Sequence, residues 1–121
     1  MKKLICVMLT ALLTLSLFAG CGAKEDDGII KVAVVQQLDH SSLDEIRTAI
    51  ETQLKALAAE KGIVMEISYD NGQNDTSMLT QIATQVVADK PDMIIPIATL
   101  AAQYAVLAAE GTDIPIVYAA I

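Results

Sequence analysis

Polar side chains of kinds that bind or transform ligands follow several apolar runs in this sequence. Asp39-His40-Ser41 follows one run, Asn71 follows a second and Thr99 follows a third. Asp, His and Ser also make up hydrolytic triads, but consecutive residues cannot converge on one point as nucleophile, base and orienting group must. We therefore expect binding and not hydrolysis. His40 either contacts a ligand, fixes its loop or is an exposed bystander.

Ser41, Ser42 and Thr99 also suit the starts of helices. A hydroxyl there caps a backbone N–H, whereas the free N–H groups and the dipole of a helix start favour a ligand carboxylate or phosphate. The Asn71 amide either holds a polar ligand group or makes a turn with Gly72. For each of these residues both roles stay open.

Tyr69 and Tyr118 lie at the ends of two predicted strands. A planar ligand could stack on them, or they could simply border the core. The sequence contains no G-x-G-x-x-G, no P-loop motif and no G-x-S-x-G elbow. The single His40 has no second His or Cys partner, which disfavours a closed zinc site. We expect no metal, no cofactor and no enzymatic activity.

The N-terminal residues predict an export signal. Lys2-Lys3 precedes an apolar run over residues 4–18 that is too short to span a bilayer comfortably. Phe18-Ala19-Gly20-Cys21 resembles the bacterial lipobox, whose cysteine receives a lipid. We expect residues 1–20 to be removed as a lipoprotein signal peptide and residues 21–28 to form a tether, with Cys21 carrying an acyl chain such as palmitate. The alternatives are a plain secretory signal and a buried cysteine.

Charge limits the range of partners. The 121 residues include 15 acidic and 8 basic side chains, for a formal charge of -7. Nucleic acid is disfavoured as a partner, because phosphate contacts need clustered Lys or Arg. The chain is long enough for one domain at most.

Behind the signal, strand and helix patterns alternate. Apolar runs at residues 29–35, 63–69, 93–97 and 114–118 predict strands, although Pro96 cannot donate to a sheet ladder. Between them, helical spacing predicts a helix from a Ser42–Glu45 capping box to Gly62, a helix that Asp75 or Thr76 caps, and a helix over residues 100–109 that Thr99 caps.

This βαβαβαβ order predicts an α/β fold with an open parallel sheet. Ligands of such sheets bind beyond the carboxyl ends of the strands. Those ends fall at residues 36–42, 69–73, 98–101 and 118–120. The fourth strand lacks a following helix to cover it, so we expect the chain to be part of a longer protein.

Blocks at these loops resemble the substrate-binding lipoproteins of ABC transporters, of the type associated with tryptophan and tyrosine uptake. The resemblance rests on Gln36 and on residues 40–44, 69–75, 88–92, 98–103 and 114–117. It covers the whole segment after the tether. The blocks occur in order, at spacings that fit the predicted helices.

The resemblance implies that residues 29–121 form part of the N-terminal lobe of a periplasmic-binding-protein type 1-like fold. It implies a solute that is amino-acid-like, with aromatic amino acids among the candidates, and a site wall that includes His40, Ser41, Asn71, Thr99 and Ala101. The implied partners are an ABC permease and its ATPase. The implied location of this protein is the extracytoplasmic face of the bacterial cell membrane, where a lipid anchors it. The alternative is a cell-surface doubly wound enzyme or ligand-sensing domain whose active residues lie beyond residue 121.

Overall fold

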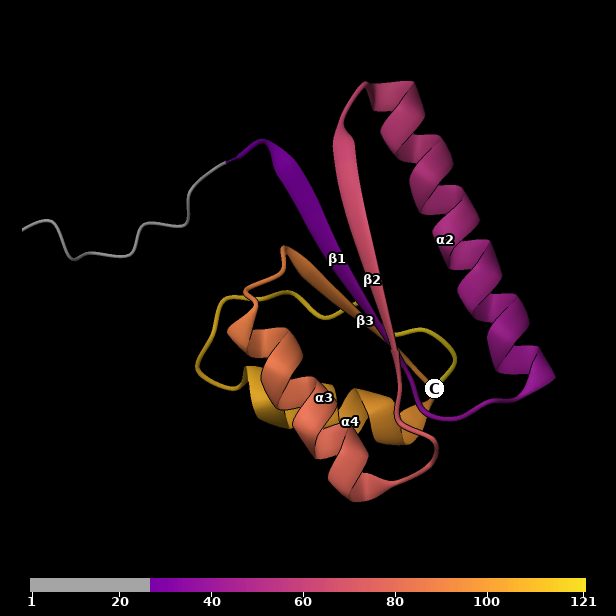
Figure 1. Ribbon diagram of the computed structural model, residues 1–121, viewed down its shortest axis with the longest axis vertical. Coiled ribbons are helices and arrows are strands. Elements are labelled where there is room, and N and C mark those ends of the chain that lie inside the picture. Colours follow the sequence, from indigo (N-terminus) through magenta and orange to yellow (C-terminus); the bar gives the residue numbers. More distant parts are fainter. Residues whose placement is uncertain (1–26) are drawn as a thin grey trace, which may run out of the picture.

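The computed structural model describes residues 27–121. In this part of the chain strands and helices alternate: β1 (Ile29–Gln36), α2 (Ser41–Lys61), β2 (Val64–Asn71), α3 (Thr76–Ala88), β3 (Met93–Ile97) and α4 (Thr99–Ala109). The strands are parallel, in the order β2-β1-β3 (Figure 1). The predicted α/β class and parallel sheet are confirmed. The predicted signal peptide, Cys21 and most of the tether lie outside the described residues.

β1 is the central strand and is covered on both faces. Val32 and Val34 belong to the cluster that packs against the apolar side of α2. Ala33 and Val35 belong to the cluster on the opposite face, which α3 and α4 cover. Figure 1 shows α2 on one side of the sheet and the α3–α4 pair on the other. This burial explains why the β1 sequence is apolar almost without interruption.

Two of the predicted helix boundaries are confirmed. α2 ends at Gly62, whose left-handed backbone (φ 64°) lets its N–H bond the carbonyls of Ala58 and Ala59. α3 begins after Asp75, whose carboxylate accepts a 2.8 Å hydrogen bond from the Met78 N–H. Asp75, and not Thr76, is therefore the cap of α3.

The other two predicted caps are wrong. α2 begins at Ser41, and the residue that caps it is His40, whose Nδ1 accepts from the Ser42 N–H. Thr99 is the first residue of α4, and no side chain of the N-cap residue Ala98 bonds to the helix. The oxygen that meets the α4 start comes instead from Gln37, whose Oε1 accepts from the Leu100 N–H at 3.0 Å. At the start of α4, the side chain of Gln37 thus provides the acceptor that the N-cap residue does not.

The fourth apolar run, residues 114–118, lies parallel to β3 as expected but is not a continuous strand. Two isolated parallel bridges join it to β3, between Ile94 and Ile116 and between Ile97 and Ala119. Pro96 lies between these bridges, and its carbonyl accepts from the Ala119 N–H at 3.1 Å. Because Pro96 has no N–H to donate in return, the ladder is interrupted there.

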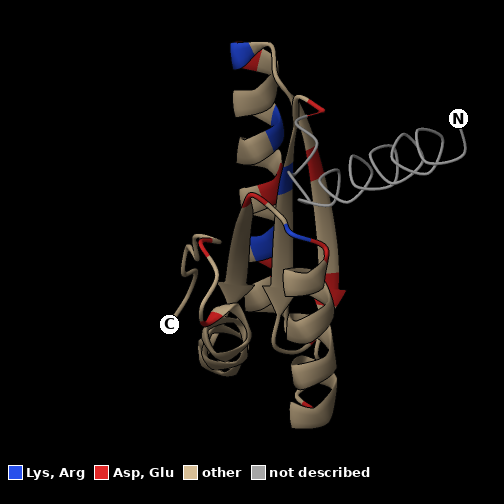
Figure 2. Cartoon of the chain, turned by 90° about the vertical axis from the view of Figure 1, so that its left-hand side faces the viewer, with Lys and Arg blue, Asp and Glu red and all other residues tan. Residues whose placement is uncertain are grey.

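Charged side chains are concentrated on α2 and near the ends of the sheet, whereas α3 and α4 contain none within their bounds (Figure 2). Two ion pairs lie along this charged part, Lys31 with Asp27 at 3.4 Å and Arg47 with Glu51 at 3.2 Å. Among residues 27–121 there is no helix with the length and apolarity needed to cross a membrane.

The packing of α3 leads to a first prediction. Leu79 is fully buried between the sheet and α4, whereas Leu107 on α4 is 65% exposed. Leu79→Ala removes buried methyl groups and leaves a cavity, so we expect it to lower the free energy of unfolding by about 2–5 kcal/mol.

Leu107→Ala is the matched control, with an expected change within about 0.5 kcal/mol. Urea titration followed by circular dichroism measures both. Equal losses in the two variants would contradict the assignment of Leu79 to the core.

Candidate functional site

The carboxyl ends of the strands and the loops that follow them meet at one edge of the sheet. We call this edge the rim and define it as residues 36–42, 69–75, 97–101 and 118–120. Backbone hydrogen bonds join its loops: Gly72 N–H to Gln36 O (2.9 Å), Gln37 N–H to Ile97 O (3.2 Å) and Ala98 N–H to Ala119 O (3.1 Å). The loops that the sequence placed together are therefore in contact.

Gln37 links three of these loops. Its Nε2 donates to Asn74 Oδ1 and its Oε1 accepts from the Leu100 N–H, both at 3.0 Å. Its carbonyl also accepts from the Asn74 N–H at 2.8 Å. Sequence reasoning did not single out Gln37. The feature of the sequence that could have pointed to Gln37 is its position directly after the apolar run of the central strand.

Gly72 brings the loop after β2 close to the rest of the rim. A Cβ there would collide with the buried Leu79 side chain and lie 3.3 Å from the Gln37 carbonyl. In this packing, position 72 has no room for a side chain larger than that of glycine. The left-handed backbone of this loop falls on Gln73 (φ 50°) and Asn74 (φ 58°) instead.

Asn71 uses both polar atoms of its side chain within the rim. Nδ2 donates to Asp39 Oδ1, and Oδ1 accepts from the Gln73 N–H at 2.8 Å. Asn71 thus connects the loop after β1 with the loop after β2. Asp39, which sequence reasoning left out of the candidate site, is exposed at this junction.

His40 and Ser41 stand at the start of α2, and both are exposed. The His40 Nδ1 accepts from the Ser42 N–H at 3.3 Å, and the His40 carbonyl accepts from the Asp44 N–H at 2.9 Å. His40 therefore fixes the loop, and its ring and the Ser41 hydroxyl lie at the surface of the rim.

The start of α4 supplies backbone donors. The intrahelical ladder begins with the Ala102 N–H bonded to Ala98 O at 3.1 Å, and Gln37 occupies the Leu100 N–H. The N–H groups of Thr99 and Ala101 are left without a partner among the described residues. Thr99 is exposed, whereas the Ala101 side chain is fully buried, so Ala101 can reach a ligand only through its backbone.

The two rim tyrosines differ in surroundings. Tyr69 has the Arg47 guanidinium 4.3 Å from its ring centroid, so one face of the ring is covered. Tyr118 is 55% exposed and lines a hollow of about 520 Å³ together with Thr99, Gln103 and Leu107. Of the two, Tyr118 is the ring next to the open start of α4.

The rim contains no Lys or Arg, and its carboxylates are those of Asp39, Asp70 and Asp75. Asp75 already caps α3. No group of three or more His, Cys, Asp or Glu residues that could hold a metal ion occurs within residues 27–121. The rim thus offers both open N–H donors and exposed carboxylates, a combination that suits a small polar solute with charges of both signs.

A parallel sheet whose strand ends form a polar rim beside helix starts places this chain in the class of α/β ligand-binding proteins. The comparison with family models specifies the class further. Residues 31–121 match the model described as ABC transporter substrate binding protein. The chain belongs to this family, and the resemblance seen in the sequence is confirmed.

Individual relatives agree with this assignment. A tyrosine-binding protein from Clostridioides difficile is 27% identical over 99% of this chain, and the match covers 38% of that protein. The chain therefore spans well under half the length of this curated relative.

Solved structures of similar fold each match 74% of this chain. A substrate-binding protein with adhesive properties from Clostridium difficile, in a ligand-free, open structure, is 34% identical, with a TM-score of 0.65 over 30% of its length. An ABC domain from Streptococcus pneumoniae in complex with L-Trp is 37% identical, with a TM-score of 0.64 over 29%. A conserved domain protein from Vibrio cholerae is 38% identical, with the same TM-score over 29%.

The cap that His40 makes leads to a second prediction. His40→Ala removes the acceptor of the Ser42 N–H, so we expect a loss of about 1 kcal/mol in the free energy of unfolding. His40→Ser is the matched variant, because a serine hydroxyl caps the same position, and we expect it to retain most of the stability. Urea unfolding of the three proteins measures the difference. Equal losses for Ala and Ser would show that the imidazole does not act as a cap.

Proposed function

We propose that this chain forms one wall of the solute site in an extracytoplasmic solute-binding protein of an ABC importer. The observation that carries the proposal is the start of α4, where the N–H groups of Thr99 and Ala101 are open beside a rim without basic side chains. A helix start of this kind binds a carboxylate through its N–H groups and its dipole.

The proposed solute is an amino acid, and aromatic amino acids are favoured. Its carboxylate lies at the Thr99 and Ala101 N–H groups, and Ser41 and His40 contribute polar contacts from the other side of the rim. Tyr118 beside Thr99 offers a ring on which an aromatic side chain stacks. The tyrosine-binding relative and the L-Trp complex support this choice.

The proposed activity is capture and delivery, without chemical change of the solute. A second lobe closes over the rim, and the closed form docks on a permease that works with an ATPase. Closure requires that the solute contact both lobes more favourably in the closed state than in the open one. The proposal places the protein at the outer face of the bacterial cell membrane, anchored by a lipid on Cys21.

A pair of substitutions at Thr99 tests the carboxylate contact. Thr99→Pro removes the backbone N–H at the first helical position, where proline is tolerated. Thr99→Ala removes only the hydroxyl. We expect Thr99→Pro to weaken binding of tryptophan or tyrosine about tenfold, because a charge-assisted hydrogen bond is lost. Thr99→Ala should have a smaller effect. Isothermal titration calorimetry measures both affinities.

The control ligand is tryptamine, which keeps the ring and the ammonium of tryptophan but has no carboxylate. Its binding should not distinguish Thr99→Pro from Thr99→Ala. An unchanged tryptophan affinity in Thr99→Pro would place the carboxylate elsewhere. Failure of the wild-type protein to bind any member of a saturating amino-acid panel would contradict the proposed function itself.

Cys21→Ser tests the proposed anchor. Because the acyl chain requires the cysteine thiol, we expect this variant to incorporate no radiolabelled palmitate when it is expressed in a bacterium. Cys6→Ser is the matched control, since Cys6 lies within the segment predicted to be removed. Labelling of Cys21→Ser equal to that of wild type would exclude Cys21 as the lipid site.

A further inference from the structure

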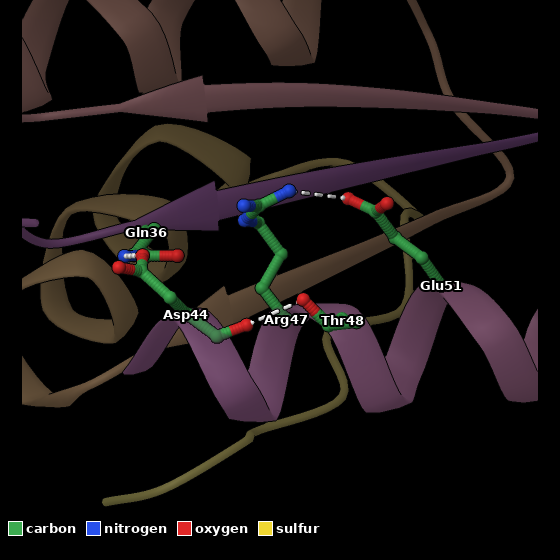
Figure 3. A network of polar contacts seen from close by, with 5 residues as sticks. All are labelled: Gln36, Asp44, Arg47, Thr48 and Glu51. Atoms are coloured by element: carbon green, nitrogen blue, oxygen red, sulfur yellow. Dashed lines mark hydrogen bonds and ion pairs between the residues drawn. The ribbon is translucent and has the colours of Figure 1, made fainter. Parts of the chain in front are cut away.

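Gln36, the last residue of β1, is a fully buried polar residue in the core of residues 27–121. Its Nε2 group donates two hydrogen bonds, to the Leu38 carbonyl at 2.7 Å and to Asp44 Oδ1 at 2.8 Å. Figure 3 shows Gln36 and Asp44 facing each other between β1 and α2. Since both N–H bonds of the amide are used, its orientation is set by these two acceptors.

These contacts hold the loop of residues 37–40 at two points. Leu38 lies inside the loop, and Asp44 lies in the first turn of α2, just beyond it. The loop carries Gln37, which bonds Asn74 just before α3 and the Leu100 N–H at the start of α4. It also carries His40, which caps α2. One buried amide therefore ties the end of the central strand to a loop on which several rim contacts depend.

Core stability alone does not account for a glutamine at this position. The Oε1 atom of Gln36 is buried and has no hydrogen-bond partner within the described residues. Leaving a buried carbonyl oxygen unpaired costs a free energy comparable with that gained from one or two hydrogen bonds. An apolar side chain of similar volume would pack against Val34 and α2 without that cost. The hydrogen bonds to Leu38 and Asp44 are what an apolar residue could not provide.

We propose that Gln36 is a positioning residue of the solute site: its amide clamps Leu38 and Asp44, and so holds residues 37–40 and the start of α2 in the conformation that binds solute. The inference rests on the proposed function. Gln36 is the fully buried member of the rim and acts through the loop, without touching the solute.

The experiment compares four variants of the purified protein. Gln36→Leu removes both clamp bonds at similar volume, and Asp44→Ala removes one acceptor. Asp44→Asn keeps an acceptor oxygen and is the conservative rescue. Thr48→Val is the matched control, because Thr48 donates its hydroxyl to the Asp44 carbonyl at 2.8 Å on the exposed side of α2 (Figure 3), outside the clamp.

The first readout is hydrogen exchange without any solute. The amides of Gln37, Ser42 and Asp44 donate to acceptors on rim residues and report on the loop directly. In Gln36→Leu and Asp44→Ala we expect their exchange to rise about tenfold while exchange in β3 stays near the wild-type rate, because only the loop opens more often. Asp44→Asn and Thr48→Val should resemble wild type. A rise that is equal in β3, or no rise in the loop, would overturn the proposal.

The second readout is the affinity for tryptophan and tyrosine. Gln36→Leu and Asp44→Ala should bind about tenfold more weakly, with Asp44→Asn close to wild type. Looser loop amides with an unchanged affinity would also overturn the positioning role. If the wild-type protein binds no amino acid, the proposed function fails, and the exchange pattern alone then decides whether Gln36 holds the loop.

Discussion

Parallel pairing of β1 with both of its neighbours is the constraint on which the rest of the structure depends. In the register of the sheet, Gln36 lies opposite Asn71 on β2 and opposite Ile97 on β3. The three strands therefore end level with one another, and each must continue into its helix from the same edge. Because parallel strands need a crossover, the three helix starts are brought to that edge as well. The rim follows from the pairing, before any particular loop residue is considered.

Side chains along β1 point alternately to the two faces of the sheet, and this alternation continues to Gln37, one residue past the end of the strand. Val32 and Val34 face α2, and so does Gln36, whereas Val35 faces α3 and α4, and Gln37 reaches Asn74 and Leu100 on that side. Two consecutive glutamines thus serve opposite faces of the sheet. One joins the end of β1 to α2, and the other joins it to the starts of the helices on the far face. This is the period-two geometry of a strand carried one residue past its end.

The strands and helices could be predicted from the sequence because their signals are local. Apolar runs gave the three strands and helical spacing gave the three helices, whereas the fourth apolar run, also predicted as a strand, forms only two isolated bridges to β3. The caps could not all be predicted: α2 is capped by the neighbouring His40 and not by Ser42, and the cap at α4 depends on another part of the fold. The oxygen at the start of α4 comes from a side chain 63 residues earlier in the sequence.

The candidate site was predictable to a similar extent. Sequence reasoning placed His40, Asn71 and Thr99 in adjoining loops, which the structure brings into contact through backbone hydrogen bonds. It did not foresee that the Asn71 side chain would be occupied with Asp39 and the Gln73 N–H. Such pairings depend on which loops become neighbours and on how their side chains are oriented. Neither is contained in the spacing of residues within one segment.

The three helix starts at the rim are not equivalent, and the difference bears on where a ligand binds. α2 is capped by His40 and α3 by Asp75, so each has a side-chain acceptor from its own N-cap residue. α4 has none, because its N-cap residue is an alanine, held at φ 76° and ψ 164° in a region that favours glycine. A helix start that is held in a strained conformation and left without a local cap has N–H groups to offer an external acceptor. A solute carboxylate that accepts from the Thr99 and Ala101 N–H groups would cap α4, as the His40 and Asp75 side chains cap α2 and α3.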